Sequence, residues 1–351
     1  MVKLIFSVIL SMIFFCGRFI IGSLIHGKHP LFIFITERIP WEDKKEKNNF
    51  RPHFQKGESM QELIYTNLQG ESACFGAAPP WILASLKGTE SSDFTRKTVK
   101  GAWQHGEQTA SLLRQDRRLE LTLNLFTFSR GDMYRQREAL CGILSAEKAF
   151  DPVTGDRAKV VYHNDHGIWW TWAMPSGAPK WGKRIQNIQP SLKLSFDCDS
   201  PYWFSMEEQK GSFDISEDGF RFPVRFPVRF ASRALDASMV NGGQAPAPLY
   251  IEILGQGEKP SLINQTTGKK LRLVSPLPVG TMLKISTDPD ALYVRMVTEG
   301  VESNAFGLLD VTTPLTDFML VPGVNVIAYD AGGAMAKTAI GMRWQDRFEG
   351  V

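Results

Sequence analysis

The sequence predicts a mainly β protein built of two β-rich domains, and three observations support this fold class. Short segments in which apolar and polar residues alternate recur along most of the chain. The 30 glycines and 20 prolines are typical of a protein in which turns join many strands. With 351 residues, 43% of them hydrophobic and 22% charged, the chain is long enough to bury two cores.

Residues 1–59 are a hydrophobic and charged leader that does not fit this pattern. Residues 4–25 are mostly apolar, but Arg18 interrupts the run at a cost of about 2.5–3.5 kcal/mol if the segment crosses a bilayer. The A-x-A cleavage site of a signal peptide does not follow. The codons of residues 56–59 can contain a ribosome-binding sequence just before Met60. We therefore expect the leader to be disordered, or a mis-assigned start that precedes an authentic start at Met60.

Charge and cysteine content argue against several classes of protein. Residues 1–59 hold nine Lys and Arg against five Asp and Glu, so the rest of the chain carries a net charge of −1 within the total of +3. This balance argues against a nucleic-acid partner. The four cysteines, at 16, 74, 141 and 198, match neither a zinc pattern nor a disulfide framework, which favours a reducing compartment. We expect Cys141 and Cys198 to be small buried hydrophobes.

The first domain, residues 60–200, begins with two predicted strands. Residues 63–65 are apolar, and residues 67–72 form the turn that follows them. Pro79-Pro80 favours extended backbone, so residues 81–86 are predicted to form the next strand. The clearest strand signal of the domain comes from four leucines that alternate with polar residues, Leu119, Leu121, Leu123 and Leu125.

One helix is predicted in this domain, immediately after Gly131. Asp132 is the expected N-cap, because its side chain can accept a hydrogen bond from the free N–H groups of the first turn. Apolar residues recur at helical spacing on one face, at Met133, Leu140, Cys141 and Leu144. We expect the helix to pack on a sheet through this face.

Residues 159–172 are predicted to form a β-hairpin whose turn comprises residues 163–167. His163 and His166 in this turn invite a metal-site hypothesis. They lack a third ligand and the helical spacing of a catalytic zinc site, so we interpret them as part of a solvated turn.

Four tryptophans follow this turn, at positions 169, 170, 172 and 181. Because side chains alternate along a strand, Trp170 and Trp172 should face away from Trp169. We interpret the group, including Trp181, as core and subunit-interface residues. Stacking on sugars or bases is the alternative.

Residues 191–198 predict a strand with one buried face, because apolar and polar residues alternate in it. Turn residues at 199–201 follow, then an aromatic group at 202–204 and a polar run at 207–211. We interpret this stretch as the seam between the first domain and the second, residues 201–351.

The second domain is predicted to be an antiparallel sandwich or jelly roll. Residues 220–230 alternate apolar residues with Arg and Pro, which predicts an edge strand with one basic face. We interpret that face as solvated or interface-facing rather than as a nucleic-acid site. Further short strands, separated by turn signals, are expected at residues 248–254, 261–264, 270–274, 282–286, 292–297, 318–320 and 324–329.

Several of these segments, in their order along the chain, resemble the distal tail proteins (Dit) of siphophages, the bacteriophages and prophages with long non-contractile tails. Each segment is a turn next to a strand, so the resemblance depends on their order, and it extends from Met60 to about Tyr329. The leader has no counterpart in the family. The segments are residues 67–70, 79–83, the Cys-Asp-Ser-Pro-Tyr-Trp run at 198–203, residues 260–268 and residues 320–327.

This resemblance implies a structural virion protein at the tail tip, assembled in the host cytoplasm. In the family, the first domain is a ring-forming β-sandwich with one helix, and the second is a sandwich similar to galectins and carbohydrate modules. A long hairpin arm near residues 101–111 would reach a neighbouring subunit. The implied partners are further copies of the chain in a hexameric ring, the major tail tube protein, and a tail-associated lysin, baseplate or receptor-binding protein. A host cell-wall glycan is a further candidate partner, and no nucleic acid is expected.

The sequence contains no nucleophile elbow, HExxH motif, phosphate-binding loop or dinucleotide fingerprint. We therefore expect no enzyme, no catalytic, cofactor-binding or metal-binding residues, and no cofactor. Two alternatives remain open. In one, the second domain is a carbohydrate-binding module that stacks sugars on Tyr202, Trp203 or Tyr293. In the other, residues 4–25 anchor a surface β protein in a membrane.

Overall fold

The computed structural model describes residues 61–215, 235–255, 257–332 and 338–351. The chain divides into two units, Met1–Lys56 and Gly57–Val351, and all described residues belong to the second unit. The predicted leader and the predicted edge strand at 220–230 lie outside the described residues. No helix in the described ranges is long and apolar enough to span a membrane.

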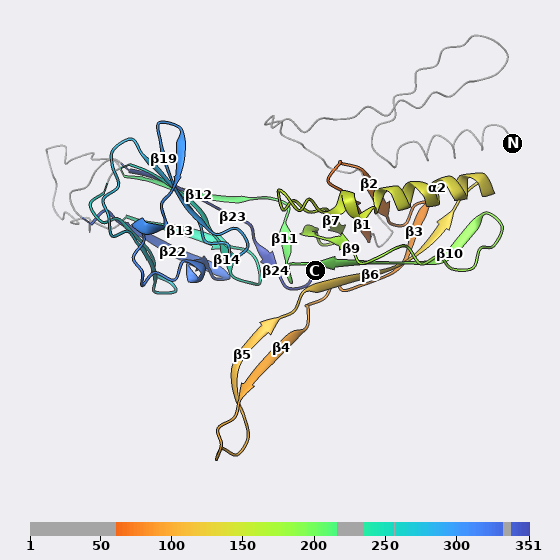
Figure 1. Ribbon diagram of the computed structural model, residues 1–351, viewed down its shortest axis with the longest axis horizontal. Helices are drawn as coiled ribbons and strands as arrows, with labels where there is room; N and C mark the ends of the chain where they lie inside the picture. The colour runs from red at the N-terminus through yellow and green to blue at the C-terminus, as the bar shows by residue number, and fades with distance from the viewer. Residues whose placement is uncertain (1–60, 216–234, 256, 333–337) are drawn as a thin grey trace, which may run out of the picture. The chain divides into compact units, whose positions relative to one another are not determined.

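The described chain is mainly β, as predicted (Figure 1). Its first half contains β1 (Glu62–Thr66), β2 (Ser72–Phe75), β3 (Trp81–Lys87), β4 (Phe94–Val99), β5 (Gln108–Arg114), β6 (Arg117–Phe126), α2 (Arg130–Ile143), α3 (Ala146–Ala149), β7 (Lys159–His163), β8 (Ile168–Trp172), β9 (Met174–Pro175), β10 (Ile188–Cys198) and β11 (Trp203–Ser205). Its second half contains β12 (Gln209–Ile215), β13 (Leu235–Asn241), β14 (Ala247–Pro248), β15 (Tyr250–Leu254), β16 (Ser261–Asn264), β17 (Lys269–Arg272), β18 (Met282–Ser286), β19 (Tyr293–Thr298), β20 (Val301–Asn304), η1 (Phe306–Leu308), η2 (Leu315–Asp317), β21 (Met319–Leu320), β22 (Gly323–Asp330), β23 (Thr338–Trp344) and β24 (Arg347–Phe348).

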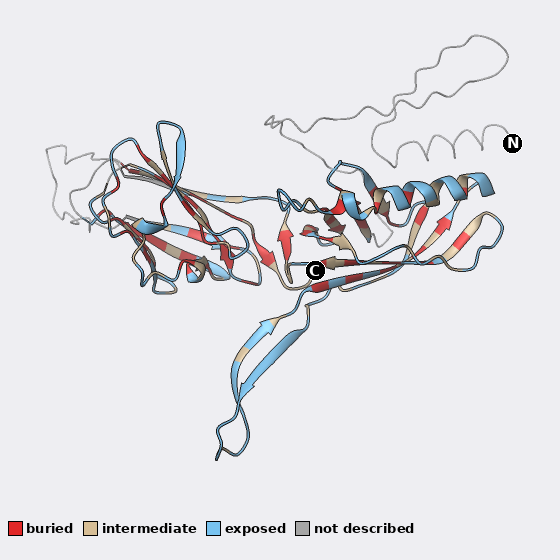
Figure 2. Ribbon diagram, in the orientation of Figure 1, coloured by how far each residue is buried: buried red, intermediate tan, exposed pale blue. Residues whose placement is uncertain are grey.

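Two antiparallel sheets supply the first core. One has six strands in the order β2-β1-β7-β8-β11-β24, and the other has four in the order β3-β6-β10-β9. The alternation predicted for β6 and β10 is confirmed, because the leucines of β6 and the apolar residues Leu192, Leu194 and Phe196 of β10 are buried (Figure 2). The polar residues between them therefore lie on the opposite face of the four-stranded sheet.

Helix α2 begins earlier than predicted. Its N-cap is Ser129, whose hydroxyl accepts a hydrogen bond from the backbone N–H of Asp132 at 3.1 Å. The prediction of Asp132 as N-cap is wrong because Ser129 already satisfies a free N–H of the first turn. Asp132 is instead the third helical residue, where its carboxylate accepts hydrogen bonds from Ser129 and Arg135. Both contacts lower its pKa, and a negative charge in the first turn suits the helix dipole.

The predicted buried face of α2 is confirmed for Met133, Leu140 and Leu144 but is wrong for Cys141, which is exposed. Adjacent helical residues point about 100° apart, so Cys141 is turned away from the face that carries Leu140. Cys198, in contrast, is fully buried as predicted. Burial raises the pKa of its thiol to about 12, so the thiol stays protonated at neutral pH.

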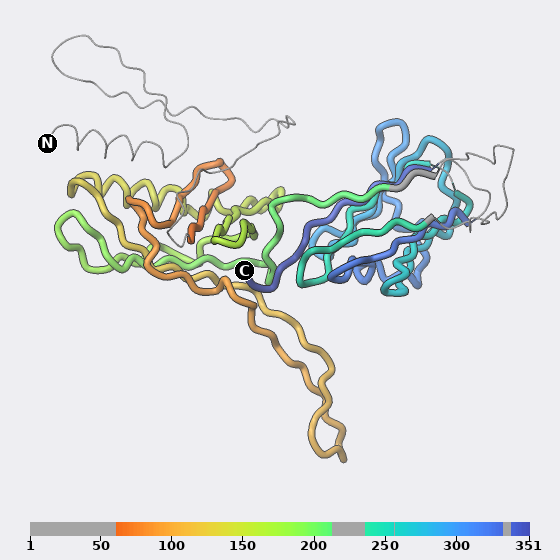
Figure 3. The backbone as a smooth tube through the Cα atoms, turned by 180° about the vertical axis from the view of Figure 1, so that it is seen from behind, coloured from red at the N-terminus to blue at the C-terminus, as the bar shows by residue number. Residues whose placement is uncertain are grey.

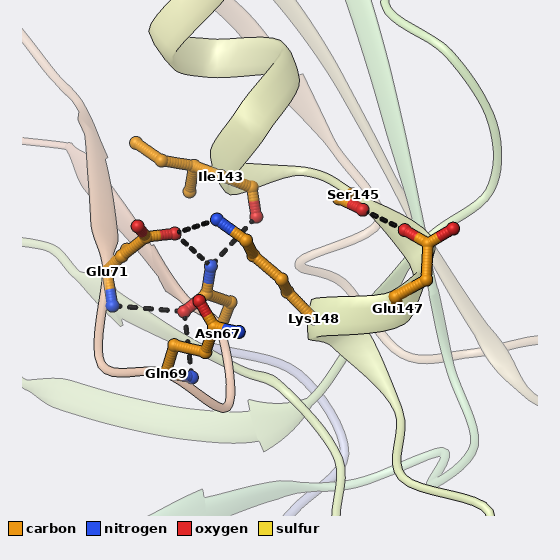
Figure 4. Close-up of polar contacts among 7 residues, drawn as sticks. All are labelled: Asn67, Gln69, Glu71, Ile143, Ser145, Glu147 and Lys148. Carbon is orange, nitrogen blue, oxygen red and sulfur yellow. Dashed lines mark hydrogen bonds and ion pairs between the residues drawn. The ribbon is translucent and has the colours of Figure 1, made fainter.

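The turn after β1 anchors the C-terminal end of α2 (Figure 4). Asn67 is buried, and its amide donates to the Ile143 carbonyl at 3.1 Å and to the Glu71 carboxylate at 2.9 Å. Its side-chain oxygen accepts from the backbone N–H groups of Gln69 and Glu71, while Lys148 of α3 pairs with Glu71. Asn67 thus closes its own turn and satisfies one of the free carbonyls at the helix end.

The second half forms another pair of antiparallel sheets around a separate core. One has six strands in the order β12-β23-β15-β18-β19-β20, and the other has four in the order β13-β22-β16-β17. Every strand predicted between residues 248 and 329 overlaps an observed strand. Strands β12, β13, β20, β23 and β24 were not predicted, and β12 begins inside the predicted polar run at 207–211.

The C-terminus returns to the first sheet. Strand β11 pairs with β8 on one side and with the C-terminal strand β24 on the other. The first core extends in sequence from Leu63 to Trp203, and the second from Met239 to Trp344. The domain division at residue 200 stays a prediction, since β11 and β24 both complete the first sheet.

Candidate assembly interface

A hairpin arm, defined here as residues 94–114, leaves the first pair of sheets between β3 and β6. Its strands β4 and β5 pair only with each other. The arm extends away from both pairs of sheets in opposite views (Figure 1 and Figure 3), and almost all of its residues are exposed (Figure 2). The hairpin predicted near residues 101–111 is therefore confirmed, and its contact with a neighbouring subunit stays a prediction.

The arm combines exposed apolar side chains with positive charge. Trp103 at its tip is 98% exposed, and its strands expose Phe94, Val99, Leu112 and Leu113. The arm contains four Lys and Arg residues and a single acidic residue, Glu107, for a net charge of +3. An isolated two-stranded hairpin is only marginally stable in water, and clustered exposed apolar residues are typical of protein-binding surfaces. This composition suits an element that becomes buried against another subunit.

Arg117 holds the arm base, defined here as residues 88–93 and 115–117. Its side chain is only 2% exposed, and its guanidinium lies 5.3 Å from the ring centroid of Trp203. The Nη groups donate to the backbone carbonyls of Gly88, Glu90, Pro201 and Glu349. Burial lowers the pKa of Arg117 to about 10, so the guanidinium remains charged at neutral pH. One side chain thus joins the arm base, the residues before β11 and the C-terminal tail.

The C-terminal tail, residues 347–351, closes against the same arm base. The N–H of Val351 donates to the carbonyl of Thr89 at 3.1 Å, and the carboxylate of Glu349 pairs with Arg114 at the end of β5. The arm base and the end of β5 are therefore both attached to the last residues of the chain. No local sequence pattern indicates this attachment, because its partners are separated by more than 200 residues.

We expect Gly350→Ala to loosen this attachment. A Cβ at position 350 would lie 2.9 Å from the nitrogen of Ser91 and 3.1 Å from the carbonyl carbon of Glu90, so the tail or the arm base must shift. Overpacking of this kind lowers the free energy of unfolding by about 1–3 kcal/mol, which urea denaturation would measure. Hydrogen exchange should rise at residues 88–93.

Gly177→Ala is the matched control for this variant. Its added Cβ meets nothing within 4 Å, and its φ is not in the left-handed region. If the two variants show the same hydrogen exchange at the arm base, the attachment through the tail is wrong.

The tryptophans after the hairpin turn alternate as predicted. Trp169 is buried, while Trp170 and Trp172 share the opposite face with ring centroids 4.9 Å apart. Trp181 packs against Trp81 with ring centroids 6.4 Å apart, and the Arg137 guanidinium lies 4.3 Å from the ring centroid of Trp181. The core role of Trp169 is confirmed, and an interface role for the others stays a prediction.

The turn with the two histidines is closed by Asn164, whose side-chain oxygen accepts from the backbone N–H groups of His166 and Gly167. His166 is exposed, and its ring stacks on Trp169 with centroids 5.9 Å apart. Within the described ranges, no group of three or more His, Cys, Asp or Glu side chains is arranged to hold a metal ion.

Of the aromatic residues considered for sugar stacking, Trp203 is excluded. Its side chain is fully buried in the first core, where its ring lies 5.7 Å from that of Tyr162 and beneath Arg117. That part of the carbohydrate-module alternative is wrong, because a buried indole presents no face to a ligand.

Tyr293 has a different environment, at the edge formed by β19 and β20. It lines a surface concavity of about 360 Å³ together with Arg295, Glu302, Asn304 and Phe306. The Arg295 guanidinium lies over the Tyr293 ring at 4.8 Å and pairs with Glu302 at 3.0 Å. Glycan binding by the second pair of sheets stays a prediction.

The fold is similar to that of solved phage tail proteins. The Dit protein of phage SPP1, described as a paradigm of the hub adsorption apparatus in phages that infect Gram-positive bacteria, superposes with a TM-score of 0.53 at 13% sequence identity. The alignment covers 82% of this chain and 99% of the SPP1 chain. This chain has the fold of a phage distal tail protein.

A chain of the phage P2 baseplate in its activated conformation with Ca superposes less closely, with a TM-score of 0.42 at 12% identity over 80% of this chain and 97% of that one. No protein-family model matches the sequence, and no curated protein matches it. The superposition on the SPP1 Dit protein confirms the distal tail fold predicted from the ordered turn-and-strand segments.

Proposed function

We propose that this protein is the hub of a phage tail tip and acts as a structural component rather than as an enzyme. The observation that carries the proposal is the arm. A distal tail fold with an exposed, apolar and basic hairpin is built to bind other subunits. The alignment covers nearly the whole of the SPP1 Dit chain, and that protein is described as a hub. This likeness supports a hub role for this protein.

In this proposal six copies close into a ring through heterologous contacts. Each arm lies against the first domain of the next copy. Six such head-to-tail contacts form a closed ring in which no copy is left with an unpaired interface. Ring closure also covers strand edges that would otherwise be open to aggregation. The second domain, residues 201–351, is carried outside the ring.

The outer face of the four-stranded sheet suits a water-filled channel. Arg118 and Glu120 of β6, and Lys193 and Asp197 of β10, lie on this face, opposite the buried leucines. Arg118 pairs with Asp197 at 2.7 Å, so the two charges partly neutralise each other. We propose that this sheet lines the central channel, with the tail tube protein on one face of the ring and a tail-associated or baseplate protein on the other. The protein would then act at the virion tail tip after assembly in the host cytoplasm.

Electron microscopy of the purified full chain tests this proposal. We expect discrete rings with a central hole in negative stain, and a mass of six chains by light scattering. The experiment should be run with and without the tail tube protein of the same phage, because a ring can require its tube as a template. Monomers under both conditions, at high protein concentration, would overturn the proposal.

A further inference from the structure

The turn after β1 and the short helix α3 bring an amine, a carboxylate and an amide together (Figure 4). The Oε2 atom of Glu71 accepts one hydrogen bond from Nζ of Lys148 at 2.7 Å and another from Nδ2 of Asn67 at 2.9 Å. The backbone fastens the same two segments, because the N–H of Leu68 donates to the carbonyl of Lys148 at 2.9 Å. A single carboxylate oxygen therefore bridges the lysine amine and the nitrogen of a side-chain amide.

The Asn67 amide is held still and its carbonyl is polarised. The residue is only 4% exposed. Its Oδ1 atom accepts from the backbone N–H groups of Gln69 at 3.1 Å and Glu71 at 3.0 Å. Two backbone N–H groups on one carbonyl oxygen are the arrangement that stabilises the oxyanion of an acyl-transfer reaction. Because Nδ2 also donates to the carbonyl of Ile143 at 3.1 Å, the amide is held from both ends.

We propose that Lys148 and Asn67 form an amide cross-link between their side chains, with Glu71 as the proton carrier. Glu71 takes a proton from the Lys148 ammonium, and the free amine attacks Cγ of Asn67. The two backbone N–H groups hold the negative charge that develops on Oδ1. The bond from Cγ to Nδ2 then breaks, and Glu71 passes its proton to Nδ2, which leaves as ammonia. The attacking nitrogen releases its second proton to solvent, so an ammonium and a primary amide become a secondary amide, ammonia and one proton.

The burial of the three groups suits this reaction. The electrophile is buried, whereas the side chains of Lys148 and Glu71 are 25% and 45% exposed, so ammonia and the released proton can reach solvent. Fixing the amine and the amide on one oxygen atom replaces a bimolecular encounter by a step within the folded chain. The step occurs once in each chain and turns over no substrate, so it suits a structural protein.

The cross-link would enclose residues 68–147, a loop that contains the hairpin arm, β6 and α2. A covalent bond between the ends of such a loop stabilises the fold chiefly by restricting the unfolded chain. The element proposed to bind a neighbouring subunit would then be anchored in a covalently closed part of the first domain. The inference concerns the folded single chain and does not rest on ring formation.

Mass spectrometry of the purified full chain, fresh and after prolonged incubation, tests the cross-link. We expect the denatured wild type to be lighter than its sequence by the mass of one ammonia molecule. A tryptic digest should yield a branched peptide that contains both Asn67 and Lys148, with no cleavage after Lys148. The cross-linked wild type should also melt about 5–10 °C above a variant that cannot form the bond.

Two variants separate the cross-link from other losses of ammonia. Lys148→Arg keeps a cation beside Glu71 but has no nucleophilic amine, and Glu71→Gln removes the proton carrier; both should keep the full sequence mass. Lys269→Arg is the matched control, because Lys269 forms an exposed ion pair with Asp317 at 2.9 Å. This control should lose ammonia as the wild type does.

Three results would overturn the inference. The first is a wild type that keeps its full sequence mass both fresh and after incubation, which would leave an ion pair beside an asparagine turn. The second is an equal loss of ammonia from Lys148→Arg, because a succinimide at an asparagine releases ammonia without any lysine. The third is a branched peptide that joins Lys148 to a residue other than Asn67.

Discussion

Replacing Arg117 with methionine is expected to lower the free energy of unfolding by about 3–5 kcal/mol. The Arg117 side chain is buried, and its Nη groups donate to backbone carbonyls at 88, 90, 201 and 349. Methionine fills a similar volume but donates no hydrogen bond, so four carbonyls lose their partner in a poorly solvated site. Each unsatisfied buried acceptor costs about 1–3 kcal/mol, and local relaxation recovers part of the total. In urea denaturation the loss would appear as a lower midpoint urea concentration, while the slope of the unfolding free energy against urea concentration stays unchanged.

Arg118→Met is the matched control, since it is the next residue of the same strand and receives the same substitution. Arg118 is exposed and forms a surface ion pair with Asp197. Such pairs contribute about 0–1 kcal/mol, so the control should unfold close to the wild type. Equal losses in the two variants would show that the contacts of Arg117 do not stabilise the junction.

Removing the apolar side chains of the arm is expected to abolish the proposed ring assembly without unfolding the protein. The variant combines Trp103→Ser, Leu112→Ser and Leu113→Ser, three residues that are exposed in the single chain. Exposed substitutions change the free energy of unfolding by about 0.5 kcal/mol or less each. Burial of such side chains in an interface contributes about 1.5–3 kcal/mol each, so the affinity between subunits should fall at least about 100-fold.

Light scattering over a range of protein concentrations would measure this loss of assembly. The control combines Val153→Ser, Val279→Ser and Val311→Ser, which removes three exposed apolar side chains outside the arm. The arm variant and the control are compared at the same protein concentration. If both form rings, the arm does not carry the subunit contact.

Strand positions could be read from the sequence because burial on one face imposes a period of two residues. Leu119 to Leu125 and Leu192 to Phe196 show this period, and all of their apolar residues are buried. Strands β12 and β13 were not predicted. Strand β12 begins in a polar segment, whereas β13 carries a period-two alternation at Leu235, Ala237 and Met239 that was not recognised. The N-cap of α2 was placed three residues late because serine and aspartate both suit that position.

A sequence signal for Arg117 did exist. It occupies the same strand parity as Leu119 and Leu121, so the period-two pattern places it on the buried face. A charged residue at a position that the pattern assigns to the core indicates a buried cation with specific partners. The identity of those partners was not accessible, because the carbonyl of Glu349 lies 232 residues away in the chain.

The sequence alone determined the β class, the single long helix, the hairpins and the order of turns that resembles distal tail proteins. These features are local, because propensity and periodicity act between residues a few positions apart. Only the tertiary structure decided that the last residues of the chain close against the base of the arm. It also decided that Trp203 lies in a core rather than on a surface, and that Lys148 and Asn67 meet at one carboxylate oxygen of Glu71. These features depend on contacts between segments distant in sequence, and no local pattern encodes which distant segments meet.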